Sequence, residues 1–440
     1  MSLRYRLKPI QVIALGYVLL SLISAFLLAL PITHEAGRSL SFIDALFVAA
    51  SAVSVTGLTV VNVSETFNLF GEIVLLFTIQ LGGIGMMTLG AVIWLILGKK
   101  IGLRDRMLIQ WDQNQITLSG LVALIQKILL IALLFEGIGA LVLGTYFLRF
   151  YAWDTAYYYG IYHSITGFTH AGFDLFGNSL IDFRHDVVVN GTMMVLLFFG
   201  GIGFPVIIEL FSYRLRRKLS LHSRFSLWIY CLLWGVGFLF FLAMEYNKSL
   251  AGEAWHHKIM MAMFQSLTTR SGGFSTLDIS TLQLPTLLVF SFLMFIGASP
   301  SSSGGGIRTT TFGTVYLAVK SYAKGTSDVN VFGRMLDFYD VRKSFVVSVF
   351  GVALVTGAVT VLSITESFEL RLLIFEAASA FGTCGLSVGI VDQFSSIGKG
   401  VLIVLMLTGR VGFGTILLLV QKQTHHCPPF RYPKERIIVG

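Results

Sequence analysis

The chain has 440 residues, of which 55% are hydrophobic and 12% carry a charged side chain. Because soluble domains contain about a quarter charged residues, this composition excludes an ordinary soluble protein and indicates a polytopic membrane protein. The net charge of +9 does not indicate nucleic-acid binding, because the basic residues gather in clusters between apolar runs, as topology signals do.

Five basic clusters divide the chain into four intervals, each roughly long enough to cross a bilayer twice. Under the positive-inside rule all five lie in the cytoplasm, which predicts eight transmembrane helices with both termini cytoplasmic. The clusters are Arg4/Arg6/Lys8; Lys99/Lys100/Arg104/Arg106; Arg214/Arg216/Arg217/Lys218/Arg224; Lys320/Lys324/Arg334/Arg342/Lys343; and Lys422/Arg431/Lys434/Arg436.

Each interval has the same order of elements: a long apolar helix, a short amphipathic segment, a glycine-containing phrase and a second helix. The first helices are expected at 9–30, 118–148, 225–246 and 344–364, and the second helices at 70–98, 187–212, 285–320 and 397–420. The short segments are 41–55, 155–169, 256–269 and 370–383. They are too short to span, so we expect re-entrant pore helices, with the extended chain after them shielded by protein or facing a water-filled path.

This order predicts four pore repeats followed by a tail. The expected units are repeat 1 at 1–98, repeat 2 at 99–212, repeat 3 at 213–320, repeat 4 at 321–420 and a cytoplasmic C-terminal tail at 421–440.

One glycine recurs after each short segment and is always followed by Leu or Phe. These glycines are Gly57, Gly172, Gly273 and Gly385, spaced 115, 101 and 112 residues apart. Such a recurrence indicates an internal repeat. Four extended phrases meeting at one axis can direct carbonyl oxygens inward and replace the hydration shell of a monovalent cation, and glycine suits such a backbone. The expected selectivity filter, with K⁺ at the four glycines, is Val55, Thr56, Gly57, His170, Ala171, Gly172, Ser271, Gly272, Gly273, Thr383, Cys384 and Gly385.

The second helix of the third interval contains "GASPSSSGGGIRTTTFG" (297–313), a poor helical sequence at membrane depth. We expect an intramembrane gating loop there, with Gly304, Gly305 and Gly306 in it. The G-x-x-x-x-G-K-[ST] spacing of a phosphate-binding loop is missing. In the corresponding "LGGIGMM" (81–87) and "FGGIGFP" (199–205), we expect the glycines mainly to allow close helix packing.

Two arginines are unusual at their positions. Arg410 lies inside an apolar helix, where a charge is rare and usually functional. We expect it to raise the barrier to cations and to be held by the loop's hydroxyls or carbonyls in the closed state. Arg270 precedes the third phrase, and we expect its side chain to point away from the axis and brace the filter.

Other polar residues are less informative. Glu136, Glu209 and Glu376 can pair with arginines, cap helices or mark an ion path, and the sequence does not choose among these. His256/His257 begin the third short segment on the external side, where an interfacial role is expected. His425/His426/Cys427 lie in the expected cytoplasmic tail and lack paired partners at zinc spacing. No metal site is expected at either group. No glycine-rich nucleotide-binding βαβ unit is present in the sequence.

In the four glycine phrases, the stretch 297–313, Arg410 within "LTGRVGFG" and the ending "RYPKERIIVG", the chain resembles the Trk/Ktr/HKT superfamily of potassium transporters. The resemblance covers the whole chain and is most specific for KtrB-type membrane subunits of bacterial Ktr systems. It implies an all-α integral membrane fold of four helix–pore-helix–helix units around a pseudo-fourfold pore, and selective K⁺ uptake across the bacterial plasma membrane. Gly57 favours K⁺, because members with serine there tend to pass Na⁺.

The resemblance also implies partners. It implies a homodimer in membrane lipid, gated by an octameric cytoplasmic ring of KtrA-type RCK subunits. The regulatory nucleotide (ATP/ADP or NADH) is then bound by the partner rather than by this chain. Whether Na⁺ activates or couples transport stays open.

Two rival functions remain. A cation-coupled (Na⁺/K⁺ or H⁺/K⁺) alternating-access secondary transporter usually carries inverted repeats, whereas these four repeats share one orientation. A membrane enzyme needs paired catalytic groups, and no histidine-rich or DxD-like cluster occurs at a membrane face. We therefore expect a channel-like transporter and not an enzyme.

Overall fold

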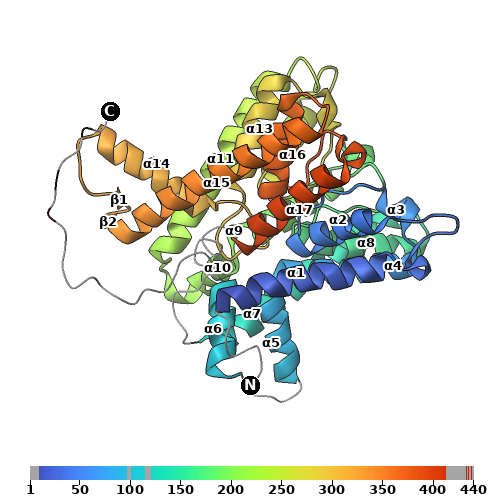
Figure 1. Cartoon of the computed structure of the whole chain (residues 1–440), viewed down its shortest axis with the longest axis horizontal. Helices are drawn as coiled ribbons and strands as arrows, with labels where there is room; N and C mark the ends of the chain where they lie inside the picture. Colours follow the sequence, from blue (N-terminus) through green and yellow to red (C-terminus); the bar gives the residue numbers. More distant parts are fainter. Residues whose placement is uncertain are drawn as a thin grey trace.

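The computed structural model describes residues 9–96, 101–113 and 120–412, with three single positions in the tail (433, 435 and 438). Regular structure in these residues is almost entirely helical (Figure 1). Within the described part of the chain, the exception is an antiparallel hairpin of β1 (Asn330–Val331) and β2 (Arg334–Met335). Phe332 and Gly333 close it at φ 49° and 73°. The fold is thus a helical assembly with one small hairpin.

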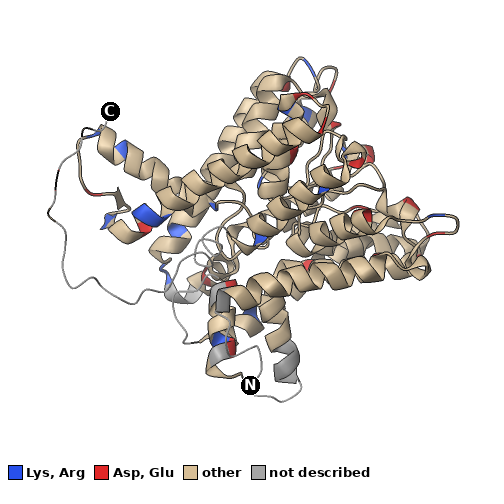
Figure 2. Cartoon of the chain, viewed as in Figure 1, with Lys and Arg blue, Asp and Glu red and all other residues tan. Residues whose placement is uncertain are grey.

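The four expected first helices are confirmed as helices long and apolar enough to span a bilayer. They are α1 (Pro9–Leu28), α7 (Leu121–Phe147), α11 (Leu221–Glu245) and α15 (Phe338–Thr365). Each exposes large apolar side chains, among them Leu19, Leu141, Leu239 and Val349. Charged residues are sparse along these helices and gather mainly near their ends and in loops (Figure 2). Such helices need lipid around them, so the chain is a multi-pass membrane protein.

Four short helices lie where re-entrant helices are expected. They are α2 (Phe42–Ser54), α8 (Trp153–Phe168), α12 (Trp255–Thr268) and α16 (Leu370–Phe381). Their last turns are buried on every side, because each packs among other helices; α2, for example, contacts α1, α4 and α17. The C-terminal ends of these helices therefore lie in the interior of the protein, while their first residues are exposed.

Short turns connect each phrase to the helix that follows it. They are α3 (Val63–Thr66) and the 3₁₀ helices η3 (Ile181–Phe183), η4 (Ile279–Thr281) and η5 (Val391–Gln393). Two further elements, η2 (Pro31–Thr33) and α6 (Leu103–Asp112), lie outside this pattern. The chain therefore leaves each phrase through a compact turn.

The second helices expected at 70–98 and 187–212 are wrong as continuous helices, because each one breaks at its second glycine-rich stretch. The third breaks at the expected non-helical stretch, and the fourth is described only as far as residue 412. The segments are α4 (Leu69–Ile84) and α5 (Met86–Ile96); α9 (Val187–Ile202) and α10 (Phe204–Arg216); α13 (Leu284–Ile296) and α14 (Thr309–Ala323); and α17 (Ser396–Val411). The break between α9 and α10 bends the chain by 104°. Among the described residues, length and composition support four membrane spans, or five with this bent pair, so eight spans remain a prediction.

Candidate ion pathway at the glycine phrases

The four phrase glycines, from segments more than 100 residues apart, lie against one another. A side-chain carbon built on Gly57 would come 2.6 Å from the Ala171 oxygen and 3.0 Å from the Gly172 Cα. One built on Gly172 would come 2.8 Å from the Gly273 Cα, and one on Gly385 would come 3.1 Å from both the Gly273 and Gly57 Cα atoms. No side chain fits at this centre, so the four backbones meet directly.

Carbonyl oxygens from the residues just before three of these glycines lie against the glycine of another phrase. The Thr56 oxygen lies next to Gly385, and the Cys384 oxygen would lie 2.8 Å from a carbon built on Gly273. The amides of the same residues face the pore helices instead. Thr56, Ala171 and Cys384 each donate to a carbonyl five residues earlier at 2.8 Å. Because the amides are engaged behind the phrases, the carbonyls are left for the centre.

The backbone of each phrase is strained at the same point. The residue two before each glycine has positive φ although none is a glycine; these are Val55 (58°), His170 (66°), Ser271 (75°) and Thr383 (45°). The glycines themselves have φ between 67° and 91°. Positive φ is unusual for a β-branched residue such as Val55 and persists only where surrounding structure enforces it. The four phrases therefore share one enforced local conformation.

Hydrogen bonds between phrases help to enforce it. The Ser271 Oγ donates to the Gly382 oxygen at 2.8 Å, and the Cys384 Sγ donates to the Thr268 oxygen at 3.3 Å. The His170 ring lies 3.0 Å from the Ser271 oxygen and 2.7 Å from the Leu197 oxygen. The side chain of His170 is thus used in bracing, and only its backbone is available to an ion.

Arg270 is fully buried beside the third phrase, at 0% exposure. Its Nη2 donates to the Thr269 Oγ1 at 3.4 Å, and its Nε and Nη1 have no hydrogen-bond partner. A buried guanidinium with so few partners is costly. Its bracing role stays a prediction.

The stretch 297–313 is non-helical only over 297–308, because α14 already begins at Thr309. Within this loop, the residues from Ser301 to Gly306 are all buried. A carbon built on Gly304 would lie 2.7 Å from the Ser271 Cβ, and one on Gly305 would lie 2.5 Å from the Thr383 Oγ1. The loop therefore sits directly against two of the phrases.

The loop is also bonded to the breaks in other second helices. The Ser303 and Ser299 amides donate to the Gly200 and Gly201 oxygens at 3.2 and 3.0 Å. The Phe204 amide donates to the Ser301 oxygen at 2.9 Å. The broken ends of α9 and α10 thus find partners in the loop rather than in a continued helix.

Arg410 joins the loop to α4. Its Nη1 donates to the Ser303 oxygen, and its Nη2 donates to the Gly82 oxygen and, at 2.9 Å, to the Gly83 oxygen. The expected contact between Arg410 and the loop carbonyls is therefore present, and a contact to α4 that the sequence did not suggest accompanies it.

The four helix breaks fall in one register and share one backbone conformation. Gly85, Gly203 and Gly412 have φ/ψ of 102°/127°, 95°/137° and 87°/126°. In the third repeat the residue at this position is Arg308, whose φ/ψ is 82°/140°. The expected close packing also occurs, since Gly82 and Gly200 lie against the Val53 and Phe168 oxygens. The stretches 81–87 and 199–205 thus serve both packing and helix breaking, whereas mainly packing was expected there.

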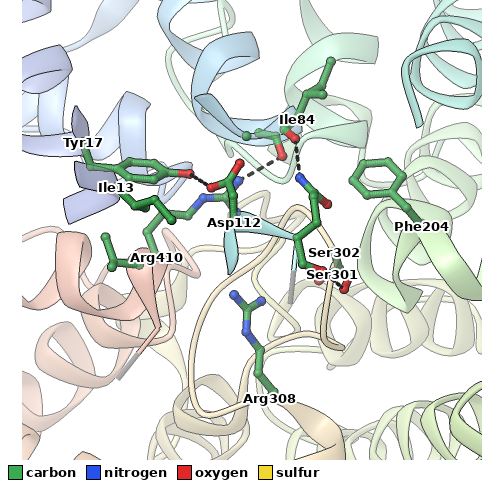
Figure 3. A pocket seen from close by; sticks show the side chains of 13 residues that line it. Ile13, Tyr17, Ile84, Asp112, Phe204, Ser301, Ser302, Arg308 and Arg410 are labelled. Carbon is green, nitrogen blue, oxygen red and sulfur yellow. Dashed lines mark hydrogen bonds between the residues drawn. The ribbon is translucent and has the colours of Figure 1, made fainter. Parts of the chain in front are cut away.

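A polar cavity lies where the loop, α1, α6 and α17 approach one another (Figure 3). The Tyr17 hydroxyl donates to the Asp112 Oδ1 at 3.4 Å, and the Ser301 Oγ donates to the Gln113 oxygen at 2.5 Å. Arg410 and Arg308 line the same cavity. Sequence reasoning missed Tyr17 and Asp112, because neither belongs to a repeated motif.

The three glutamates left open by the sequence accept hydrogen bonds from neutral groups. Glu136 accepts from the Gln80 Nε2 at 2.7 Å, and Glu209 accepts from the Ser220 amide at 2.8 Å. Glu376, on α16, accepts from the Ser387 Oγ and the Val388 amide at 2.7 and 2.8 Å. Glu376 thereby holds the segment that follows the fourth phrase.

The chain is similar to known cation transport proteins over nearly its full length. The TrkH family model, described as "Cation transport protein", matches residues 8–426. The chain is 47% identical to Ktr system potassium uptake protein D of Bacillus subtilis, over 99% of this chain and 98% of that protein. It is 36% identical to Ktr system potassium uptake protein B of the same organism, over 99% and 97%.

Other relatives carry related names. The chain is 34% identical to the potassium/sodium uptake protein NtpJ of Enterococcus hirae, over 99% of this chain and 98% of that protein. The crystal structure of the potassium transporter TrkH from Vibrio parahaemolyticus matches with a TM-score of 0.72 at 20% identity, over 96% of this chain and 87% of that chain. The chain therefore belongs to the TrkH/Ktr family of cation transport proteins.

Proposed function

We propose that this chain is the membrane subunit of a bacterial K⁺ uptake system of the Ktr type, with its selectivity filter at the four glycine phrases. The observation that carries the proposal is the direct meeting of Gly57, Gly172, Gly273 and Gly385. Backbone carbonyls arranged around such a centre can replace the hydration shell of K⁺. The four pore repeats at 1–98, 99–212, 213–320 and 321–420 each supply one phrase.

The ligands in this proposal are main-chain oxygens rather than side chains. The inward position of the Thr56, Ala171 and Cys384 oxygens supports it. A ring of neutral carbonyls favours a weakly hydrated monovalent ion over Mg²⁺, which dehydrates reluctantly. The names of the relatives, two potassium uptake proteins and a potassium/sodium uptake protein, agree with K⁺ as the transported ion.

The loop 297–308 is the gate in this proposal. Its contact with Ser271 and Thr383 places it beside two phrases, and its bonds to Gly200, Gly201 and Arg410 hold it there. The positive charge of Arg410 raises the barrier to a cation. Opening then requires the loop to leave these partners, and the glycines Gly304 to Gly306 give it backbone freedom.

The assembly around the subunit follows from the Ktr resemblance. It comprises a homodimer in the bacterial plasma membrane, both termini in the cytoplasm, and an octameric ring of KtrA-type RCK subunits that binds the regulatory nucleotide. The names of two relatives place those relatives in a Ktr system. The C-terminal tail at 421–440, expected to be cytoplasmic, lies outside the described residues except for single positions.

The test is ion flux through liposomes that contain the purified chain. Rubidium or K⁺ uptake that is competed poorly by Na⁺ supports a K⁺-selective pore. A coupled alternating-access transporter instead requires a Na⁺ or proton gradient and saturates at a slow rate. Absence of any cation flux, with or without the gradients and the regulatory partner, contradicts both.

A further inference from the structure

Three ionisable side chains that the ion pathway does not use meet near the start of α12. His185 lies between η3 and α9, Glu253 lies just before α12, and His257 lies in its first turn. The His185 Nε2 is 2.7 Å from the Glu253 Oε2, and the His257 Nδ1 is 4.0 Å from the same oxygen. The two imidazole rings stack at 4.5 Å with 21° between their planes.

The donor atoms of the three residues lie close enough together to be brought to a single metal ion. One donor atom from each of the three residues lies within 4.8 Å of the others. Zinc binds imidazole nitrogen and carboxylate oxygen at about 2.0–2.2 Å, so small side-chain rotations bring all three donors to one ion. Imidazole donors select borderline transition metals over hard ions such as Mg²⁺ or Ca²⁺.

The cluster is also accessible to an ion in solution. The side chains of His185, Glu253 and His257 are 45%, 17% and 25% exposed. An ion bound by three protein ligands keeps a coordination position for water. Glu253 lies two residues before α12 and His257 lies in its first turn, so the start of this helix fixes the backbone of both ligands.

We propose that His185, Glu253 and His257 form a binding site for a divalent transition-metal ion, with zinc as the best fit. Bound metal links the segment before α9 to the start of α12, whose other end leads to the third phrase. The site could not be predicted from the sequence, because His185 and Glu253 are 68 residues apart. The site also differs from the sequence prediction for His257, which assigns His256/His257 an interfacial role and no metal.

One nearby cation opposes metal binding. The Arg184 Nη2 lies 3.5 Å from the Glu253 Oε1. This ion pair partly neutralises the carboxylate and so competes with a metal ion for it. Arg184→Gln removes this competitor and leaves all three ligands in place. We therefore expect this variant to bind zinc about threefold or more tightly, in keeping with the small energy of a partly exposed ion pair.

Equilibrium dialysis of the purified full chain against zinc, with bound metal quantified, tests the site. We expect His185→Ala and His257→Ala each to bind about one equivalent less than the unchanged chain. Glu253→Gln, which nearly preserves shape, should bind at least about tenfold more weakly, because a charged ligand is lost. His222→Ala, at an exposed histidine outside the cluster, is the matched control and should bind the full amount.

A second readout shows whether the variants still fold. Zinc should raise the thermal midpoint of the unchanged chain and of His222→Ala, because a ligand that binds only the folded state stabilises it. The midpoint of His185→Ala should not respond to zinc, while its metal-free midpoint should stay close to that of the unchanged chain. Equal zinc stoichiometry in all variants overturns the site. Neither readout uses K⁺ transport, so the result is independent of the proposed function.

Discussion

Arg410 on α17 donates a hydrogen bond to the carbonyl oxygen of Ser303, which lies 107 residues earlier in the chain. The same guanidinium bonds the Gly82 and Gly83 oxygens of α4. One side chain therefore holds the loop 297–308 to two helices at once. In the proposed function, its charge and its hydrogen bonds both favour a closed pathway.

Removal of Arg410 should open that pathway. We expect Arg410→Ala to raise rubidium flux about tenfold in liposomes without a regulatory partner, which corresponds to a barrier lowered by about 1.4 kcal/mol. Arg410→Lys keeps the charge but cannot span several carbonyls in the same way, so its flux should fall between the two. Arg342→Ala, at an exposed arginine on α15, should leave flux unchanged. Unchanged or lower flux in Arg410→Ala contradicts the gate.

Gly385 tests the filter itself. An alanine methyl there would overlap the Thr56 oxygen, and the backbone φ of 90° is unfavourable for any residue with a Cβ. We expect Gly385→Ala to lower K⁺ flux about tenfold or more, a barrier change of about 1.4 kcal/mol. Gly400→Ala is the matched control, because a carbon built on Gly400 meets nothing within 4 Å. Equal flux from the two variants would count against a filter at the phrases.

Much of the fold could be predicted because its signals are local. Long apolar runs predicted α1, α7, α11 and α15, and the repeated glycine after each short segment predicted which phrases come together. Those signals depend on residue type and spacing alone. The four phrases could therefore be assigned to the same site from residue type and spacing.

The breaks in the second helices could not be predicted in the same way. A glycine inside an apolar helix can serve close packing or end the helix. At Gly203 the decision comes from a distant segment: the Phe204 amide donates to the Ser301 oxygen, and a carbon on Gly203 would lie 2.5 Å from the Pro300 oxygen. The pairing of Tyr17 with Asp112 likewise depends on contacts between remote parts of the chain.

Arg270 tests whether the filter needs support from behind. Its guanidinium is fully buried, so truncation leaves a cavity next to Ser271 and the third phrase. We expect Arg270→Ala to lower the preference for K⁺ over Na⁺ about tenfold in a competition flux assay, because looser carbonyls accept the smaller ion. Arg371→Ala, at an arginine whose side chain is 46% exposed, should retain the preference. Unchanged selectivity and flux in Arg270→Ala would remove the bracing role.

Arg308 tests the shared conformation of the helix breaks. It has φ 82° and ψ 140°, a region that costs a non-glycine residue about 1–3 kcal/mol. The residues at the same position of the other three breaks are Gly85, Gly203 and Gly412, which avoid that cost. Arg308→Gly and Arg308→Ala both lose the hydrogen bond from Nη1 to the Gly304 oxygen. The difference between their thermal midpoints therefore reports only the cost of the backbone conformation at position 308. The glycine variant should have the higher thermal midpoint in detergent.

The opposite order is expected at an ordinary helical position, which makes the comparison decisive. Lys320 is exposed near the end of α14, and glycine there is less favourable than alanine by about 1 kcal/mol. Lys320→Ala should therefore melt above Lys320→Gly. If alanine is also the better residue at position 308, the backbone there is relaxed in solution and the common register of the four breaks is lost. If glycine gives the higher thermal midpoint only at position 308, the backbone of Arg308 is strained in the folded protein. The hydrogen bond from Arg308 to the Gly304 carbonyl then explains why an arginine is present there despite the strain.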